Sequence, residues 1–290
     1  MTLEKQSPAK VNLLLNVLGR RADGFHELET VLQPVKVFDE LSFARANGGI
    51  HLDCNEPDLP TDSGNLVYRA AAAFLQKAGI KDGVRIRLEK RIPLAAGLGG
   101  GSGNAATTLT TLNELFGQPL SPESLHAIAA ALGSDIPFFL QTRPALATGR
   151  GETLQPMDGF PALQGRAFLL IHPGFGISTA WAYQQLARFP TALNGQPGRA
   201  RKLISKLQET DLKTAGAEFY NSLEAPALAK YPLLALFQEF LRENGAAATL
   251  MSGSGSTTFA VTPDRAAADQ LAEKFKGRFG TTYWITAVAI

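Results

Sequence analysis

Residues 93–106 decide how the rest of this chain is interpreted: they read Pro93-Leu94-Ala95-Ala96-Gly97-Leu98-Gly99-Gly100-Gly101-Ser102-Gly103-Asn104-Ala105-Ala106. Before this glycine loop, residues 83–90 alternate apolar and charged side chains, as a strand with one exposed face does. After it, leucines recur at helical spacing up to residue 117. Glycines between a strand and a helix start can aim several amide N–H groups at one point, where the helix dipole also favours an anion. The stretch therefore predicts a phosphate-binding loop rather than a simple tight turn.

Several other phosphate motifs do not fit the sequence. It has no Gly-Lys pair, which a P-loop requires, and it has neither His-Arg-Asp nor Asp-Phe-Gly of the protein kinases. A dinucleotide fingerprint is the stronger rival, because residues 101–106 fit G-x-G-x-x-A and Glu123 follows about twenty residues later. However, the preceding strand alternates instead of being continuously apolar, and Glu123 falls in the first turn of a helix predicted over 121–132. The dinucleotide hypothesis is therefore disfavoured.

Composition limits the class of protein. The chain has 290 residues, 45% hydrophobic and 19% charged, with a formal net charge of +2, which is too small to indicate a nucleic-acid surface. Its single cysteine, Cys54, excludes an internal disulfide and a cysteine zinc cluster. No apolar run approaches the roughly 18 residues of a membrane span, and the N-terminus lacks a signal pattern. These features predict a cytoplasmic protein with neither a membrane nor a nucleic-acid partner.

The pattern along the chain predicts an α+β protein. Strands 31–44 and 50–54 are expected to form a hairpin through the turn at residues 47–49. Residues 62–65 are expected to introduce a helix that runs through Leu66 and ends at Gly79, and a domain boundary near 158 divides the chain into domains 1–158 and 159–290.

Four further segments carry residues that, taken alone, can each be explained by an ordinary structural role. Lys10 and Asn12 share one face of a strand, as solvated edge residues do. Phe25 and His26 lie in a basic turn that could be an exposed hairpin tip. Asp135 could cap a short helix. A second glycine turn, Ser252-Gly253-Ser254-Gly255-Ser256, follows a predicted strand.

Together these segments resemble the motifs of the GHMP small-molecule kinases. The glycine loop is similar to their phosphate-binding motif P-x-x-x-G-L-G-G-G-S-x-N-A-A, and residues 251–256 resemble their third motif. Residues 134–139 resemble the segment with the catalytic aspartate, and 172–179 resemble the substrate loop. Residues 7–13 and 24–28 resemble the branch that phosphorylates the 2-hydroxyl of a cytidine-diphosphate derivative of methylerythritol, on a route to isoprenoids.

The resemblance implies a fold and a set of roles. It implies a two-domain GHMP kinase fold, with a ribosomal-protein-S5-like N-terminal domain and a ferredoxin-like C-terminal domain. It implies ATP and Mg²⁺, and a small-molecule substrate. Asp135 would be the general base and Lys10 its partner, which favours the ionised carboxylate and stabilises the transferring group. The implied ATP-binding residues are Asn65, Leu66, Pro93, Gly97, Leu98, Gly99, Gly100, Gly101, Ser102, Gly253 and Ser254, with Ser102 near the metal. The implied substrate-binding residues are Asn12, Phe25, His26, Thr179 and Tyr183, where Phe25 and Tyr183 would stack on the cytosine ring.

Three residues depart from the family pattern. Gly103 stands where a second serine is common, Phe25 stands where tyrosine is common, and Ser134 stands where alanine or glycine is usual. None of them removes a catalytic group. Other GHMP activities, such as phosphorylation of mevalonate or homoserine, remain the alternative. A nucleotide-binding protein without catalysis is the alternative from another class, and the presence of both Asp135 and Lys10 disfavours it.

Overall fold

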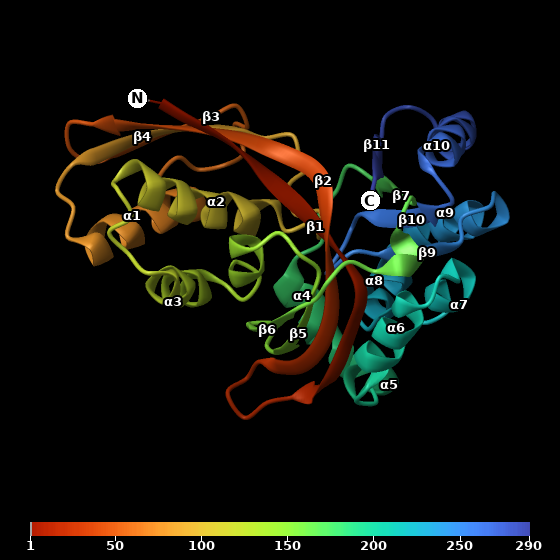
Figure 1. The fold of residues 1–290 in the computed structure, drawn as a ribbon. Coiled ribbons are helices and arrows are strands. Elements are labelled where there is room, and N and C mark those ends of the chain that lie inside the picture. The colour runs from red at the N-terminus through yellow and green to blue at the C-terminus, as the bar shows by residue number, and fades with distance from the viewer. Residues whose placement is uncertain (1) are drawn as a thin grey trace. The chain divides into compact units, whose positions relative to one another are not determined.

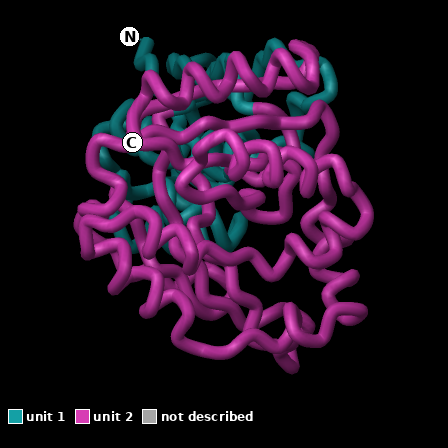
Figure 2. Tube along the Cα trace, turned by 90° about the vertical axis from the view of Figure 1, so that its right-hand side faces the viewer, with its two compact units in different colours: residues 1–9, 37–92, 99–142 teal, residues 10–36, 93–98, 143–290 magenta. Residues whose placement is uncertain are grey.

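The computed structural model describes residues 2–290, with mixed α and β content as predicted. The chain divides into two compact units, each made of segments that are separate in the sequence (Figure 2). Unit 1 contains residues 1–9, 37–92 and 99–142, and unit 2 contains 10–36, 93–98 and 143–290. The boundary at residue 158 stays a prediction.

Unit 1 is built on strand β4 (Gly83–Glu89), which has a partner along each edge. β4 pairs antiparallel with β2 (His26–Ala46) and parallel with β3 (Ile50–Cys54). The predicted hairpin of 31–44 with 50–54 is therefore wrong, because β4 lies between these two strands. β4 enters beside the turn that was expected to close the hairpin: a Cβ on Gly83 would lie only 2.3 Å from the Gly48 carbonyl oxygen.

Three helices of unit 1 lie on one side of these strands (Figure 1). Their ends follow local capping signals. The Oδ1 atom of Asn65 accepts a hydrogen bond from the backbone of Val67 at 2.9 Å, and Gly79 ends the same helix in the left-handed region at φ 67°. Ser121 caps a later helix in the same way. The helices are α1 (Leu66–Ala78), α2 (Gly100–Leu115) and α3 (Pro122–Leu132), followed by η1 (Pro137–Leu140).

Unit 2 contains parts of β1 (Thr2–Arg20) and β2, two long strands that run through both units. Within unit 2, β2 pairs antiparallel with β5 (Ala145–Gly149), and β1 pairs parallel with β8 (Tyr220–Asn221). β5 also pairs with β6 (Thr153–Pro156).

A second, antiparallel sheet in unit 2 has the strand order β11-β7-β10-β9. Its core includes the rings of Phe237 on α9 (Pro232–Glu243) and Phe275 on α10 (Arg265–Phe279), which meet edge to face with centroids 4.7 Å apart. The strands are β7 (Ala167–His172), β9 (Ala248–Met251), β10 (Thr258–Thr262) and β11 (Trp284–Ala289).

The remaining helices of unit 2 are mostly short. No helix within residues 2–290 has the length and apolar character needed to cross a membrane. The α-helices are α4 (Thr179–Gln185), α5 (Pro190–Leu193), α6 (Arg199–Gln208), α7 (Leu212–Gly216), α8 (Glu224–Lys230), α9 (Pro232–Glu243) and α10 (Arg265–Phe279). Two 3-10 turns, η2 (Pro161–Leu163) and η3 (Leu186–Arg188), complete the unit.

Candidate active site

Lys10 lies on β1 and is only 3% exposed. Its Nζ atom donates to the Asn12 Oδ1 atom at 2.5 Å and to the Gly97 carbonyl oxygen at 2.9 Å. The backbone N–H of Lys10 also donates to the Leu98 carbonyl at 2.9 Å. A buried ammonium needs such oxygen partners, because desolvation of the charge is costly. The solvated-edge interpretation of Lys10 and Asn12 is therefore wrong, since both side chains are buried and paired.

The second glycine turn packs against the first loop within unit 2. The Ser252 hydroxyl donates to the Gly97 carbonyl at 2.9 Å, so this carbonyl accepts from both Ser252 and Lys10. Gly97 has φ 74°, and a Cβ there would lie 2.0 Å from the Ser252 carbonyl oxygen. Gly253 has φ 56°, and its Cβ position is 3.2 Å from the Lys10 Nζ atom. Only glycine fits at these two positions, where two backbone turns meet around one buried cation.

The segment after β7 also contacts the second glycine turn. The hydroxyls of Thr179 and Ser254 lie 2.9 Å apart. The Ser256 hydroxyl donates to the Phe175 carbonyl, and its oxygen lies 3.3 Å from the His172 Nδ1 atom. Because the Ser256 proton is directed to Phe175, the oxygen is available to accept from Nδ1–H of a neutral His172. Burial lowers the pKa of His172 from 6.5 to about 4.

The predicted base-stacking residues form two separate ring contacts in unit 2. His26 lies against Tyr183, with ring centroids 4.9 Å apart. Phe25 is 53% exposed, and the Arg150 guanidinium sits over its ring at 4.7 Å. Burial lowers the pKa of His26, and the charge of Arg20 adds to this effect. Exposed aromatic surface near cationic side chains suits a flat ring that carries phosphate groups.

The predicted ATP-binding residues of unit 1 lie around the start of α2. Gly99 precedes this helix in the left-handed region at φ 72°, and no acidic residue occurs in the first turn. A Cβ on Gly101 would lie 3.6 Å from Leu66 Cδ1, which places the Asn65–Leu66 helix start beside the glycine loop. Backbone amides at a helix N-terminus whose first turn contains no acidic residue favour an anion.

Asp135 lies in the turn between α3 and η1 in unit 1, where it is half-buried. Its pairing with Lys10, which belongs to unit 2, stays a prediction. Among residues 2–290, no group of three or more histidine, cysteine, aspartate or glutamate side chains could hold a metal ion.

Two structural residues of this region had no sequence signal. Asn221 donates from Nδ2 to the carbonyls of Met251 and Gly253, each at 2.7 Å. Thr30 accepts from Asn12 Nδ2 at 2.8 Å. Both residues lie far along the chain from the groups that they hold, so no local pattern identifies them.

Family models match both halves of the chain. The model "GHMP kinases N terminal domain" matches residues 65–143, and "GHMP kinases C terminal" matches residues 200–281. The fold and the glycine turns therefore define a GHMP kinase.

Relatives of similar length narrow the class. A 4-diphosphocytidyl-2-C-methyl-D-erythritol kinase of Pelotomaculum thermopropionicum is 41% identical over 277 residues, covering 95% of this chain and 94% of the relative. A kinase of the same name from Geobacter sp. strain M21 is 41% identical over 281 residues and covers 96% of each chain. This chain belongs to the family of 4-diphosphocytidyl-2-C-methyl-D-erythritol kinases.

Solved structures agree with this assignment. A crystal structure of 4-(cytidine 5'-diphospho)-2C-methyl-D-erythritol kinase is 34% identical, has a TM-score of 0.79 and covers 99% of this chain and all of its own. A homoserine kinase from Cytophaga hutchinsonii has a TM-score of 0.78 with 20% identity, covering 100% of this chain and 95% of its own. At that identity the likeness concerns the fold alone.

Proposed function

We propose that this kinase transfers the γ-phosphoryl group of ATP to the 2-hydroxyl of 4-diphosphocytidyl-2-C-methyl-D-erythritol, in isoprenoid biosynthesis. The observation that carries the proposal is the buried Lys10 ammonium, which is held against Gly97 of the glycine loop. Membership of the family supports the choice of acceptor.

Asp135 and Lys10 would act on the reacting groups. The Asp135 carboxylate would take the proton of the 2-hydroxyl, whose oxygen then bonds to the γ-phosphorus while the bond to ADP breaks. The Lys10 ammonium would lie near the transferring phosphoryl group and stabilise its charge. Phosphoryl transfer depends mainly on positioning and electrostatics, so one base and one fixed cation suit this chemistry.

The phosphates of ATP would bind to the main-chain amides of the glycine loop at the start of α2. Pro93, Leu98 and the glycines of the loop would shape this surface, while Asn65 and Leu66 would contact the adenine. Gly253 and Ser254 would also contact the phosphates. Mg²⁺ bound with ATP would neutralise phosphate charge, and the Ser102 hydroxyl is the residue that we propose as its protein ligand.

The substrate would bind through residues of unit 2. Phe25 and Tyr183 would stack on the cytosine ring, and His26 would meet its edge. Asn12 would orient the acceptor hydroxyl region. Thr179, whose hydroxyl lies 2.9 Å from that of Ser254, would link the substrate loop to the second glycine turn.

The finer fold names and the cellular setting are also proposals. The four-stranded antiparallel sheet with helices α9 and α10 supports a ferredoxin-like C-terminal domain, and an S5-like fold is proposed for the N-terminal domain. The single cysteine supports a cytoplasmic location, and the small net charge supports the absence of a nucleic-acid partner.

ADP release with a panel of acceptors tests the proposed function. 4-Diphosphocytidyl-2-C-methyl-D-erythritol, mevalonate and homoserine would each be supplied with ATP and Mg²⁺. We expect ADP release to depend on the cytidine-bearing acceptor. Faster release with mevalonate or homoserine would assign the chain to another GHMP activity.

A further inference from the structure

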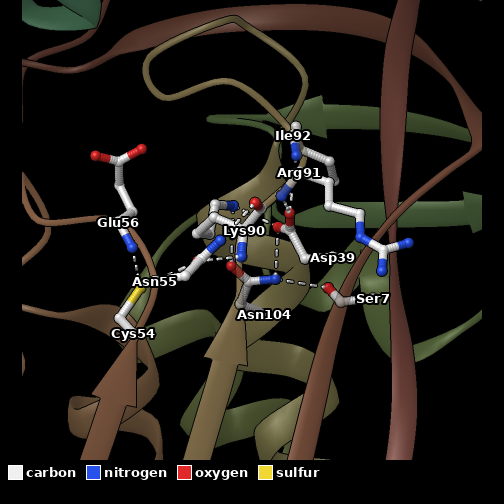
Figure 3. A network of polar contacts seen from close by, with 9 residues as sticks. All are labelled: Ser7, Asp39, Cys54, Asn55, Glu56, Lys90, Arg91, Ile92 and Asn104. Atoms are coloured by element: carbon white, nitrogen blue, oxygen red, sulfur yellow. Dashed lines mark hydrogen bonds and ion pairs between the residues drawn. The ribbon is translucent and has the colours of Figure 1, made fainter.

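A buried polar network in unit 1 connects the segments that flank the glycine loop (Figure 3). Asp39 on β2 is 0% exposed, and its Oδ1 atom accepts hydrogen bonds from the backbone N–H groups of Arg91 at 2.8 Å and Ile92 at 2.9 Å. β4 ends at residue 89, so these two amides belong to the chain just before the loop. The carboxylate therefore fixes the backbone of the two residues that immediately precede the loop.

The second oxygen of Asp39 binds the start of α2, into which the glycine loop continues. Its Oδ2 atom forms an ion pair with Lys90 and accepts from Asn104 Nδ2 at 2.9 Å. Asn104 lies one turn into α2, and its Oδ1 atom accepts from Lys90 Nζ at 3.2 Å. Asn104 Nδ2 also donates to the Ser7 hydroxyl on β1 at 3.0 Å. One carboxylate thus joins the end of β4 to the first turns of α2.

Lys90 is fixed by its backbone as well as by its side chain. Its N–H donates to Asn55 Oδ1 at 2.7 Å, and Asn55 Nδ2 donates to its carbonyl at 3.2 Å. A Cβ on Gly100 would lie 3.1 Å from the Lys90 Nζ atom. The ammonium therefore lies against the backbone of the first residue of α2, on the side that the network occupies.

Burial of such an ionic network carries a free-energy cost, because its charges lose their contact with water. The desolvation of a buried ion pair can exceed the attraction between its charges, and apolar side chains of similar volume are often equally stable. Here every oxygen of Asp39 is satisfied, and its partners all lie within the segments that lead into and out of the loop. This arrangement favours a role in setting loop geometry over a role in stability alone.

We propose that Asp39 and Asn104 are positioning residues for the phosphate-binding glycine loop. They hold residues 91–92 and the first turns of α2 at a fixed separation, so that the loop amides face the ATP phosphates before ATP binds. The inference rests on the proposed function, because it takes ATP as the anion that the loop binds.

Preorganised donors bind more tightly because less freedom is lost on binding. Removing one hydrogen bond of the network should therefore weaken ATP binding. It should leave the proposed acceptor site, which is built from residues of unit 2, unaffected. A residue with a purely structural role would lower thermal stability without this selective effect on ATP.

The variant Asn104→Ala tests the proposal. Asp39 keeps Lys90 and both backbone donors in this variant, and alanine is a good helix former, so the chain should still fold. Two controls remove other side-chain hydrogen bonds that involve α2. Thr111→Val removes the bond from the Thr111 hydroxyl to the Thr107 carbonyl, at 2.6 Å in the same helix. Ser7→Ala removes one partner of Asn104 but leaves Asp39, Lys90 and Asn104 joined.

Calorimetric titration with ATP, the KM of the acceptor and thermal unfolding would be measured for each variant. We expect Asn104→Ala to weaken ATP binding at least fivefold with the acceptor KM within twofold of the wild type. Both controls should stay within twofold for ATP. Wild-type ATP affinity in Asn104→Ala would overturn the proposal, and so would an equal loss of ATP affinity in either control.

The titration also separates this inference from the proposed function. Wild-type protein that binds ATP but releases no ADP with the cytidine-bearing acceptor would contradict the function. The dissociation constants for ATP would still decide the role of Asn104 in that case.

Discussion

The Gly97 carbonyl oxygen accepts hydrogen bonds from the Lys10 ammonium and from the Ser252 hydroxyl, each at 2.9 Å. One backbone oxygen therefore connects strand β1, the glycine loop and the second glycine turn. Lys10 cannot shift without breaking this contact, so its charge has a fixed location beside the loop.

Lys10→Met should lower kcat by about a hundredfold or more, which is typical for loss of a preorganised charge that stabilises a transition state. Methionine has a similar length and suits a buried site, so the variant should remain folded. Steady-state ADP release and circular dichroism check these two expectations. A folded variant with kcat within tenfold of the wild type would remove Lys10 from catalysis.

Asp135→Asn should leave ATP affinity nearly unchanged and lower kcat by about 10²- to 10⁴-fold, as expected when a general base is lost. Asparagine keeps the shape of the side chain but cannot take a proton from the acceptor hydroxyl. ATP titration and single-turnover kinetics would measure the two effects separately. Near-normal turnover would exclude the base role.

Phe25→Ala and Tyr183→Ala should each raise the KM of the acceptor, because stacking of a base on an aromatic ring contributes about 1–3 kcal/mol. The KM of ATP should stay the same, since both rings belong to the proposed acceptor site. In the structure, Tyr183 contacts His26 while Phe25 contacts Arg150. If neither variant changes the acceptor KM, the cytosine does not stack on these rings.

Gly103→Ala should destabilise the fold by about 1–3 kcal/mol, as overpacking of a close contact does. A Cβ on Gly103 would lie 2.7 Å from the Pro8 carbonyl oxygen and 2.9 Å from the Ser7 hydroxyl. The serine that is common in this motif would therefore not fit here without movement of β1.

Gly101→Ala is the matched control, because its Cβ would make an ordinary 3.6 Å contact with Leu66. Urea unfolding of both variants should show a loss for Gly103→Ala and a small gain in helix stability for Gly101→Ala. Equal stability of the two variants would contradict the steric argument.

His172 should make unfolding stability depend on pH between 6.5 and about 4. Its folded-state pKa lies below the unfolded value, so the unfolded chain binds more protons in this range, and stability falls as the pH falls. The loss should reach on the order of 2 kcal/mol after allowance for partial solvent screening. Urea unfolding at pH 7 and pH 5 would measure it.

His172→Asn is the control for this pH effect, because its Nδ2 group can still donate to the Ser256 oxygen but does not titrate. We expect a smaller dependence of stability on pH in this variant. An unchanged dependence would assign the effect to other groups.

Features with local causes could be predicted from the sequence. The helix that ends at Gly79 and the helix over 121–132 were both predicted, and the structure confirms them. Asn65 and Ser121 begin these helices, and Gly79 ends the first one, through hydrogen-bond partners within a few residues. The strand before the glycine loop and the helix after it were also predicted from local sequence patterns, and the structure confirms both. The predicted hairpin is wrong because strand pairing depends on which other strands compete for the same edge of a sheet. Here β4, which starts about thirty residues after the end of β3, pairs with both β2 and β3.

The sequence alone was enough to predict the class of ligand at the glycine loop, because an amide-lined turn at a helix start favours an anion whatever surrounds it. Only the tertiary structure decided which groups hold that loop. Lys10 and Gly97 are 87 positions apart, and Asp39 and Asn104 are 65 positions apart, yet both pairs are joined within single units. The burial that makes these contacts strong arises only when distant segments exclude water together, and no local pattern records which segments will do so.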